Sequence, residues 1–119
     1  MIMKRTSLKI EERIKELEFK IENLLQLVDI RRAPFSYLVV ENNLTKEQVD
    51  EIYLLMDDFT TYIHAGQKAR LADFERELYK IVPSKDRDYH FAADVVGSLH
   101  DEEKYAELYD ALKRRGMNV

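Results

Sequence analysis

The feature that most constrains the fold of this chain is a repeat of apolar residues near its N-terminus. Within residues 7–29, six apolar side chains follow one another at intervals of 4, 3, 4, 3 and 4 residues. Because an α-helix turns about 100° per residue, this spacing places all six on one stripe less than about 90° wide. So narrow a stripe is typical of a helix that packs on other helices in a bundle or coiled coil. The stripe consists of Ile10, Ile14, Leu17, Ile21, Leu24 and Val28.

A second, thinner set of apolar residues lies on the opposite side of the same expected helix. Leu8, Phe19 and Ile30 are spaced by 11 residues, and polar residues surround Phe19. A single exposed apolar side chain is common, and the stripe itself could be covered by the chain's own helix over residues 46–65. Two apolar faces are harder to cover within one bundle than one. We therefore expect a homo-oligomer, with a dimer favoured, that self-associates through the stripe together with Leu8, Phe19 and Ile30.

The rest of the chain also shows helical patterning. Thr45 and Gln48 form a capping box at the start of a helix over residues 46–65, and Gly66 can take the left-handed conformation that ends it. Residues 35–41 have the composition of a strand, but a lone strand would lack a partner, so we favour a short helix that Pro34 begins. Further helices are expected over residues 71–81, from residue 84 or 86 onward, and from Asp101 to the segment before residue 116.

Composition agrees with an all-helical fold. The chain of 119 residues contains only 3 Gly and 2 Pro, too few for the frequent turns of a β-sandwich. We predict an all-α, single-domain antiparallel bundle of about five or six helices covering residues 1–119, with a long heptad-patterned first helix. Thr6 or Ser7 could cap that first helix. Only short apolar runs occur, so we expect no membrane span and a cytoplasmic protein.

The sequence contains few residues that could catalyse a reaction or bind a metal or cofactor. There is no Cys, which removes thiolate nucleophiles and cysteine metal sites. The three glycines lie far apart, unlike those of phosphate-binding loops. His90 and Asp94 share a helix face and form a weak candidate for two metal ligands, but one such pair is expected by chance in a chain with 35% charged residues. We expect no catalytic residues, no cofactor and no enzymatic activity.

Charge leaves one alternative function open. The net charge is −4, which argues mildly against a dedicated nucleic-acid binder. Basic residues nevertheless gather in residues 68–87, where they alternate with acidic ones as on a solvated helix face. A nucleic-acid-binding or regulatory role for this segment is the alternative to a self-associating interaction protein, which we favour. The basic residues are Lys68, Arg70, Arg76, Lys80, Lys85 and Arg87.

The order of these features resembles the YhaI-like family of small helical proteins from low-GC Gram-positive bacteria. The resemblance rests on the heptad-patterned first helix, the Pro34-Phe35 break, the cap over residues 44–48 and the closing segment over residues 101–109, which begins Asp-Glu-Glu and ends Leu-Tyr. It covers nearly the whole chain. It implies a multihelical, oligomeric bundle, and it brings no established activity and no functional residues.

Overall fold

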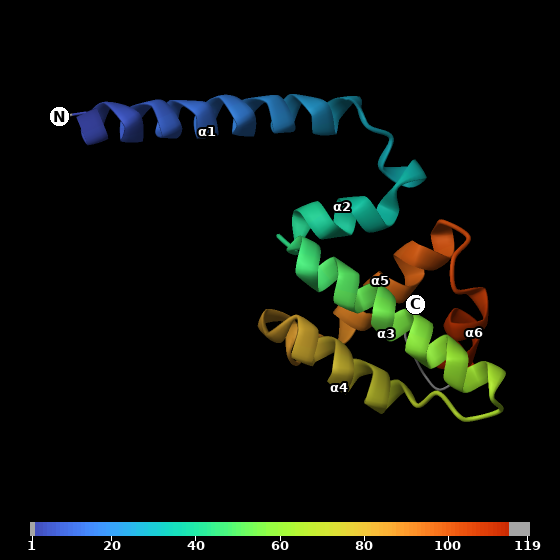
Figure 1. Cartoon of the computed structure of the whole chain (residues 1–119). Helices are drawn as coiled ribbons and strands as arrows, with labels where there is room; N and C mark the ends of the chain where they lie inside the picture. Colours follow the sequence, from blue (N-terminus) through green and yellow to red (C-terminus); the bar gives the residue numbers. More distant parts are fainter. Residues whose placement is uncertain (1, 115–119) are drawn as a thin grey trace. The chain divides into compact units, whose positions relative to one another are not determined.

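The heptad-bearing segment folds as one uninterrupted helix, α1 (Ile2–Leu27), in the computed structural model of the chain (Figure 1). The structure describes residues 2–114, except for the side chains of residues 2–6, Ile30 and Tyr89. The helix begins at Ile2, so the expectation that it starts near Ser7 with a cap at Thr6 or Ser7 is wrong. Residues 2–6 include no Gly or Pro and consist largely of good helix formers, so nothing stops the helix at Ser7.

The chain divides into two compact units, Met1–Arg31 and Arg32–Val119. The first unit contains α1, and every side chain of α1 that the structure describes is exposed. The second unit contains the other α-helices and all the buried residues found in the described part of the chain. The prediction of one domain over residues 1–119 stays a prediction, because a division by compactness does not measure independent folding.

The short helix predicted over residues 35–41, in preference to a strand, is present and begins at Pro34. After the 3₁₀ turn η1 (Ile30–Arg32), helix α2 (Pro34–Glu41) has Pro34 in its first turn, where a missing N–H costs nothing. No side chain next to it in sequence caps this helix. Its Phe35 N–H instead donates a hydrogen bond to Glu102 Oε2 at 2.9 Å, across 67 residues of sequence. A distant carboxylate therefore serves as the cap of α2.

Local signals set both ends of helix α3 (Lys46–His64), as predicted. At its start, the Gln48 N–H donates to Thr45 Oγ1 at 3.1 Å, and the Thr45 N–H donates to Gln48 Oε1 at 2.9 Å. At its end, Gly66 has a φ of 77°, and the N–H groups of Gly66 and Gln67 donate to the carbonyls of Ile63 and Tyr62. This is the paired arrangement that commonly stops a helix at a glycine.

The last helices confirm the predicted order, with two boundaries corrected, since the helix expected from residue 84 or 86 begins only at Tyr89. Helix α4 (Leu71–Ile81) is followed by the 3₁₀ turn η2 (Pro83–Lys85), α5 (Tyr89–Asp101) and α6 (Ala106–Arg114). The acidic run at Asp101 does not begin the last helix, because Asp101 is the final residue of α5. Glu103, with a φ of 63°, takes the left-handed position at the end of α5, and its N–H donates to the His100 carbonyl at 2.8 Å.

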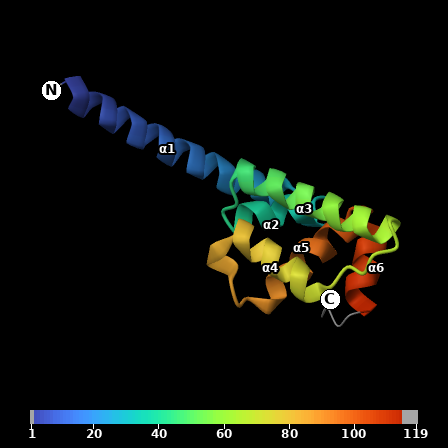
Figure 2. The same cartoon turned by 60° about the horizontal axis from the view of Figure 1, so that its bottom comes forward.

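The all-α prediction is confirmed, since every regular element in residues 2–114 is helical. Within the second unit, α3 packs on α4 and α6, while α5 packs on α2 and α6 (Figures 1 and 2). The core between these helices is wholly apolar among the described residues, with no buried polar side chain lacking a partner. Its fully buried large side chains are Ile52, Met56, Phe74, Leu78, Val82, Val95, Val96, Leu99, Leu108 and Leu112.

Candidate interaction surface

Most of the predicted self-association residues lie on the exposed helix α1. Leu8 and Phe19, which lie on one side of α1, and the six stripe residues on the other are each between 48% and 66% exposed. The side chain of Ile30 lies outside the described residues. A single helix cannot bury its own apolar face, so the first unit taken by itself leaves this surface open to solvent.

The stripe on α1 has a regular heptad register. Its 4-3 spacing puts Ile14, Ile21 and Val28 at the a positions of the repeat, and Ile10, Leu17 and Leu24 at the d positions. These six residues form what we call the seam. Val28 follows directly after the last residue of the helix. Phe19 lies opposite the seam, at an f position, and Leu8 lies beside it around the helix.

Charged residues flank the seam in a sorted order that the sequence predictions did not include. The e positions on one side carry Glu11 and Glu18, and the g positions on the other carry Arg13 and Lys20. The last repeat has Leu25 and Leu27 at these positions instead. All four charged side chains are exposed. Sequence spacing alone contains this signal once the a and d positions are assigned, so reading the flanking residues heptad by heptad would have found it.

The apolar stripe of α3 is covered inside the second unit. Ile52 and Met56 are fully buried there, Phe59 is 5% exposed, and the ring of Phe59 meets the ring of Phe74 edge to face at 5.3 Å. This stripe belongs to a core that residues of the second unit complete among themselves. The core of the second unit therefore consists of its own side chains.

The weak metal candidate gains no third ligand. His90 and Asp94 lie on the first turns of α5, and both are exposed. No group of three His, Cys, Asp or Glu side chains that could hold a metal ion is found among the described residues. Partial burial raises the pKa of Asp94, and the nearby negative charge of Asp88 raises it further, while His90 opposes the rise. The proposal of a metal site at His90 and Asp94 has no support from this geometry.

A hollow of about 390 Å³ lies between α2 and α5, and Asp94 lines it. Its other polar lining includes Glu41 and Asp101, so its wall is acidic. In this wall the Ser98 hydroxyl donates to the Val95 carbonyl at 2.9 Å, and the Tyr37 hydroxyl donates to Glu41 Oε1 at 3.4 Å. We assign no catalytic role to this hollow.

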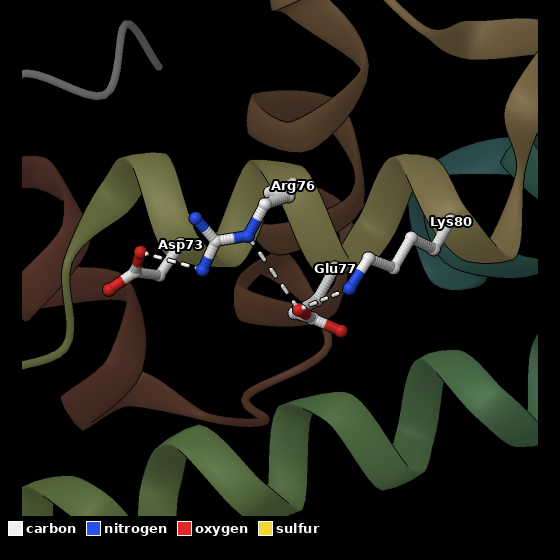
Figure 3. A network of polar contacts seen from close by, with 4 residues as sticks. All are labelled: Asp73, Arg76, Glu77 and Lys80. Atoms are coloured by element: carbon white, nitrogen blue, oxygen red, sulfur yellow. Dashed lines mark hydrogen bonds and ion pairs between the residues drawn. The ribbon is translucent and has the colours of Figure 1, made fainter.

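Acidic neighbours pair with some of the basic groups of residues 68–87. On α4, an Arg76 guanidinium nitrogen lies 2.9 Å from Asp73 Oδ1, and a second lies 3.8 Å from Glu77 Oε1. Lys80 Nζ lies 3.0 Å from the same Glu77 oxygen, so the four side chains form one chain of ion pairs along the helix (Figure 3). These pairs are exposed and worth at most about 1 kcal/mol each, but they offset the positive charge that a phosphate backbone would meet.

Comparisons with known proteins place the chain in a family. No solved structure matches it. In residues 2–114, no helix is long and apolar enough to cross a membrane. Residues 8–115 match the family described as "Protein of unknown function (DUF1878)", which is most of the chain and includes the whole seam. On this match, the chain belongs to the DUF1878 family of proteins of unknown function.

Proposed function

We propose that this protein is a self-associating structural or interaction protein, and that the seam on α1 is its contact surface. The observation that carries the proposal is the exposure of the seam, whose six side chains are each about half exposed. Fully burying an aliphatic side chain of this size is worth about 1.5–3 kcal/mol relative to full exposure, so completing the burial of a half-exposed one is worth about half of that. Six of them in one stripe therefore supply a strong drive toward a partner helix.

The separate core of the second unit supports the same proposal. Its buried residues, from Phe35 to Leu112, come from the helices α2 to α6 and the loops between them. The narrow seam, with charged residues on both sides, is the pattern of a coiled-coil contact rather than of a globular helix face. We also propose, on the residues quoted for that resemblance, that the chain is one of the YhaI-like proteins.

The alternative of nucleic-acid binding through residues 68–87 is less well supported. Arg76 and Lys80 are paired with carboxylates on their own helix. Proteins bind nucleic acids largely through Lys and Arg side chains that displace the counterions of the phosphates. Lys and Arg side chains that are already paired with carboxylates do this poorly. For this reason we rank self-association above nucleic-acid binding.

Light scattering coupled to size-exclusion chromatography tests the proposal. We expect the wild-type chain to show a mass of about twice its 14.2 kDa at micromolar concentration and above. Leu17→Asp places a charge in the seam and should give a monomer. Gln26→Asp adds the same charge on the far side of α1, where it should leave the oligomer intact.

A wild-type monomer that persists as the concentration is raised would overturn the proposal. The fold of each variant can be checked separately, because all seven tyrosines lie in the second unit. Tyrosine fluorescence therefore follows the unfolding of that unit alone. A loss of the oligomer in Leu17→Asp with unchanged tyrosine unfolding assigns the effect to the seam.

A further inference from the structure

The charges beside the seam restrict the direction in which a second α1 can lie. In a coiled coil, residues at e and g flank the apolar contact and choose the partner's orientation. Here each side of the seam carries one sign, with Glu11 and Glu18 at e and Arg13 and Lys20 at g. When two copies pair, an e side that faces a g side is therefore attracted to it, whereas two e sides or two g sides that face each other repel.

A parallel pairing brings opposite charges together. In a parallel, in-register pair, a g residue faces the e residue that lies five positions further along the second helix. Arg13 of each copy then faces Glu18 of the other copy, so a symmetric dimer has two such attractive pairs. The other charged g residue, Lys20, faces Leu25 of the second copy and meets no like charge.

An antiparallel pairing brings like charges together. With the two seams fully overlapped, g faces g and e faces e across the contact. Lys20 would then face Lys20 of the second copy, and Glu18 would face Glu18. Like charges at such positions are destabilising, and no attractive pair replaces them.

Arg13 and Glu18 cannot satisfy each other within one chain. They are five residues apart, which puts them about 140° apart around the helix. Side chains meet along one helix only at spacings of three or four residues. No ion pair of either residue is found among the described side chains, so their charges remain available to a second chain.

We propose that α1 pairs with α1 of a second copy of this chain as a parallel, in-register, two-stranded coiled coil. In it, Arg13 and Glu18 of opposite copies form ion pairs on both sides of the seam. This inference rests on the proposed function and adds to it the partner, the orientation and the strand number. The strand number follows from the seam, because Ile14, Ile21 and Val28 at a, with Leu17 and Leu24 at two of the three d positions, favour two strands.

Disulfide trapping tests the orientation, and the absence of Cys in the natural chain makes every introduced thiol unique. Ser7 occupies the a position before Ile14, so replacing it removes no apolar contact. Under mild oxidation, Ser7→Cys should form a cross-linked dimer because facing a positions lie within disulfide reach. Glu12→Cys, on the outer side of α1, is the matched control and should stay largely monomeric on a non-reducing gel.

The antiparallel arrangement has its own probe. An equimolar mixture of Ile14→Cys and Leu24→Cys gives a disulfide between residues 14 and 24 only if these residues face each other. In the parallel pair they are ten residues apart along the axis, or about 15 Å. Recovery of a 14-to-24 linked peptide by mass spectrometry, with no cross-link in Ser7→Cys, would overturn the parallel orientation.

A charge swap tests the ion pair itself. Arg13→Glu should raise the dissociation constant about tenfold, as should Glu18→Arg, because each replaces two attractive pairs with repulsive ones. The double variant restores opposite charges and should return to within about threefold of wild type. Lys15→Glu makes the same charge change away from the seam and serves as the control.

The outcomes separate this inference from the proposed function. A wild-type monomer defeats both. The protein could be a dimer whose double charge-swap variant has a dissociation constant raised by the product of the two single-variant increases. That result defeats the Arg13–Glu18 pairing while self-association stands. A three-chain mass by light scattering defeats the two-stranded assignment, even where Ser7→Cys cross-links.

Discussion

Helices α1 and α3 are the two longest helices in the described part of the chain, and both carry apolar residues at spacings of three and four. The seam of α1 is less than about 90° wide, whereas the apolar face of α3 spans about 160° from Leu55 round to Tyr53. A face wider than about 100° is typical of a helix in a globular core. On α3 this face is buried or half-buried in the second unit, and on α1 the seam is exposed.

This difference teaches that the width of an apolar face is as informative as its period. The period identifies a helix, and both segments are helices. The width indicates how many neighbours the helix must contact. Helix α3 meets both α4 and α6, which requires a broad face. The seam of α1 has the width for one partner helix.

The largest expected effect compares one buried and one exposed side chain. Met56→Ala on α3 should lower the free energy of unfolding of the second unit by about 3 kcal/mol, because it removes a fully buried side chain and leaves a cavity. Leu17→Ala on α1 should change it by less than about 0.5 kcal/mol. Urea unfolding followed by tyrosine fluorescence measures both. An equal loss of unfolding free energy in the two variants would contradict the difference in burial between α3 and α1.

The next effect concerns the starts of the two helices. Thr45→Ala should lower the free energy of unfolding by about 1 kcal/mol, because it removes the acceptor of the Gln48 N–H at the start of α3. Ser7→Ala should cost nothing measurable, because Ser7 lies inside α1 rather than at its start. The same urea titration checks Thr45→Ala, and circular dichroism at 222 nm checks the helix content of Ser7→Ala. A drop in helix content for Ser7→Ala would restore the discarded cap.

The smallest effect concerns a polar anchor that α3 has within its own unit. The Tyr105 hydroxyl donates a hydrogen bond to Asp57 Oδ1 at 3.0 Å, linking α3 to the start of α6. Tyr105→Phe should cost about 0.5 kcal/mol at neutral pH, since the site is partly exposed to solvent. Thermal unfolding of the two proteins at matched concentration measures this difference.

The same tyrosine makes stability depend on alkaline pH. Burial raises the pKa of Tyr105 to about 12, and the hydrogen bond and negative charge of Asp57 add to the rise. In the unfolded chain the phenol titrates near its ordinary value of about 10. Its stabilising contribution is therefore complete below pH 10 and is lost as the pH rises toward 12. The free energy of unfolding should fall less steeply over this interval in Tyr105→Phe, and identical slopes would contradict this assignment.

Sequence reasoning located most of the fold because its strongest signals are local. The capping box at Thr45, the stop at Gly66 and the short helix begun by Pro34 each depend on residues within a few positions of one another. Their hydrogen bonds form wherever the helix forms. The candidate surface was also readable, since the seam is a periodic pattern within one helix. Its flanking charges need only the register to be interpreted.

The acidic run at residues 101–103 marks where local reasoning stops. Acidic residues before an apolar segment favour a helix start, yet here they end α5, and α6 begins at Ala106. Glu102 instead accepts the Phe35 N–H, and a local pattern cannot predict a hydrogen bond between residues 67 positions apart. Packing α5 against α2 creates that bond, because it brings a carboxylate to an uncapped helix start, where the N–H groups favour negative charge. The helices and the seam thus follow from residues a few positions apart in the sequence. The cap that Glu102 gives α2 and the end of α5 at Asp101 required the folded arrangement of helices.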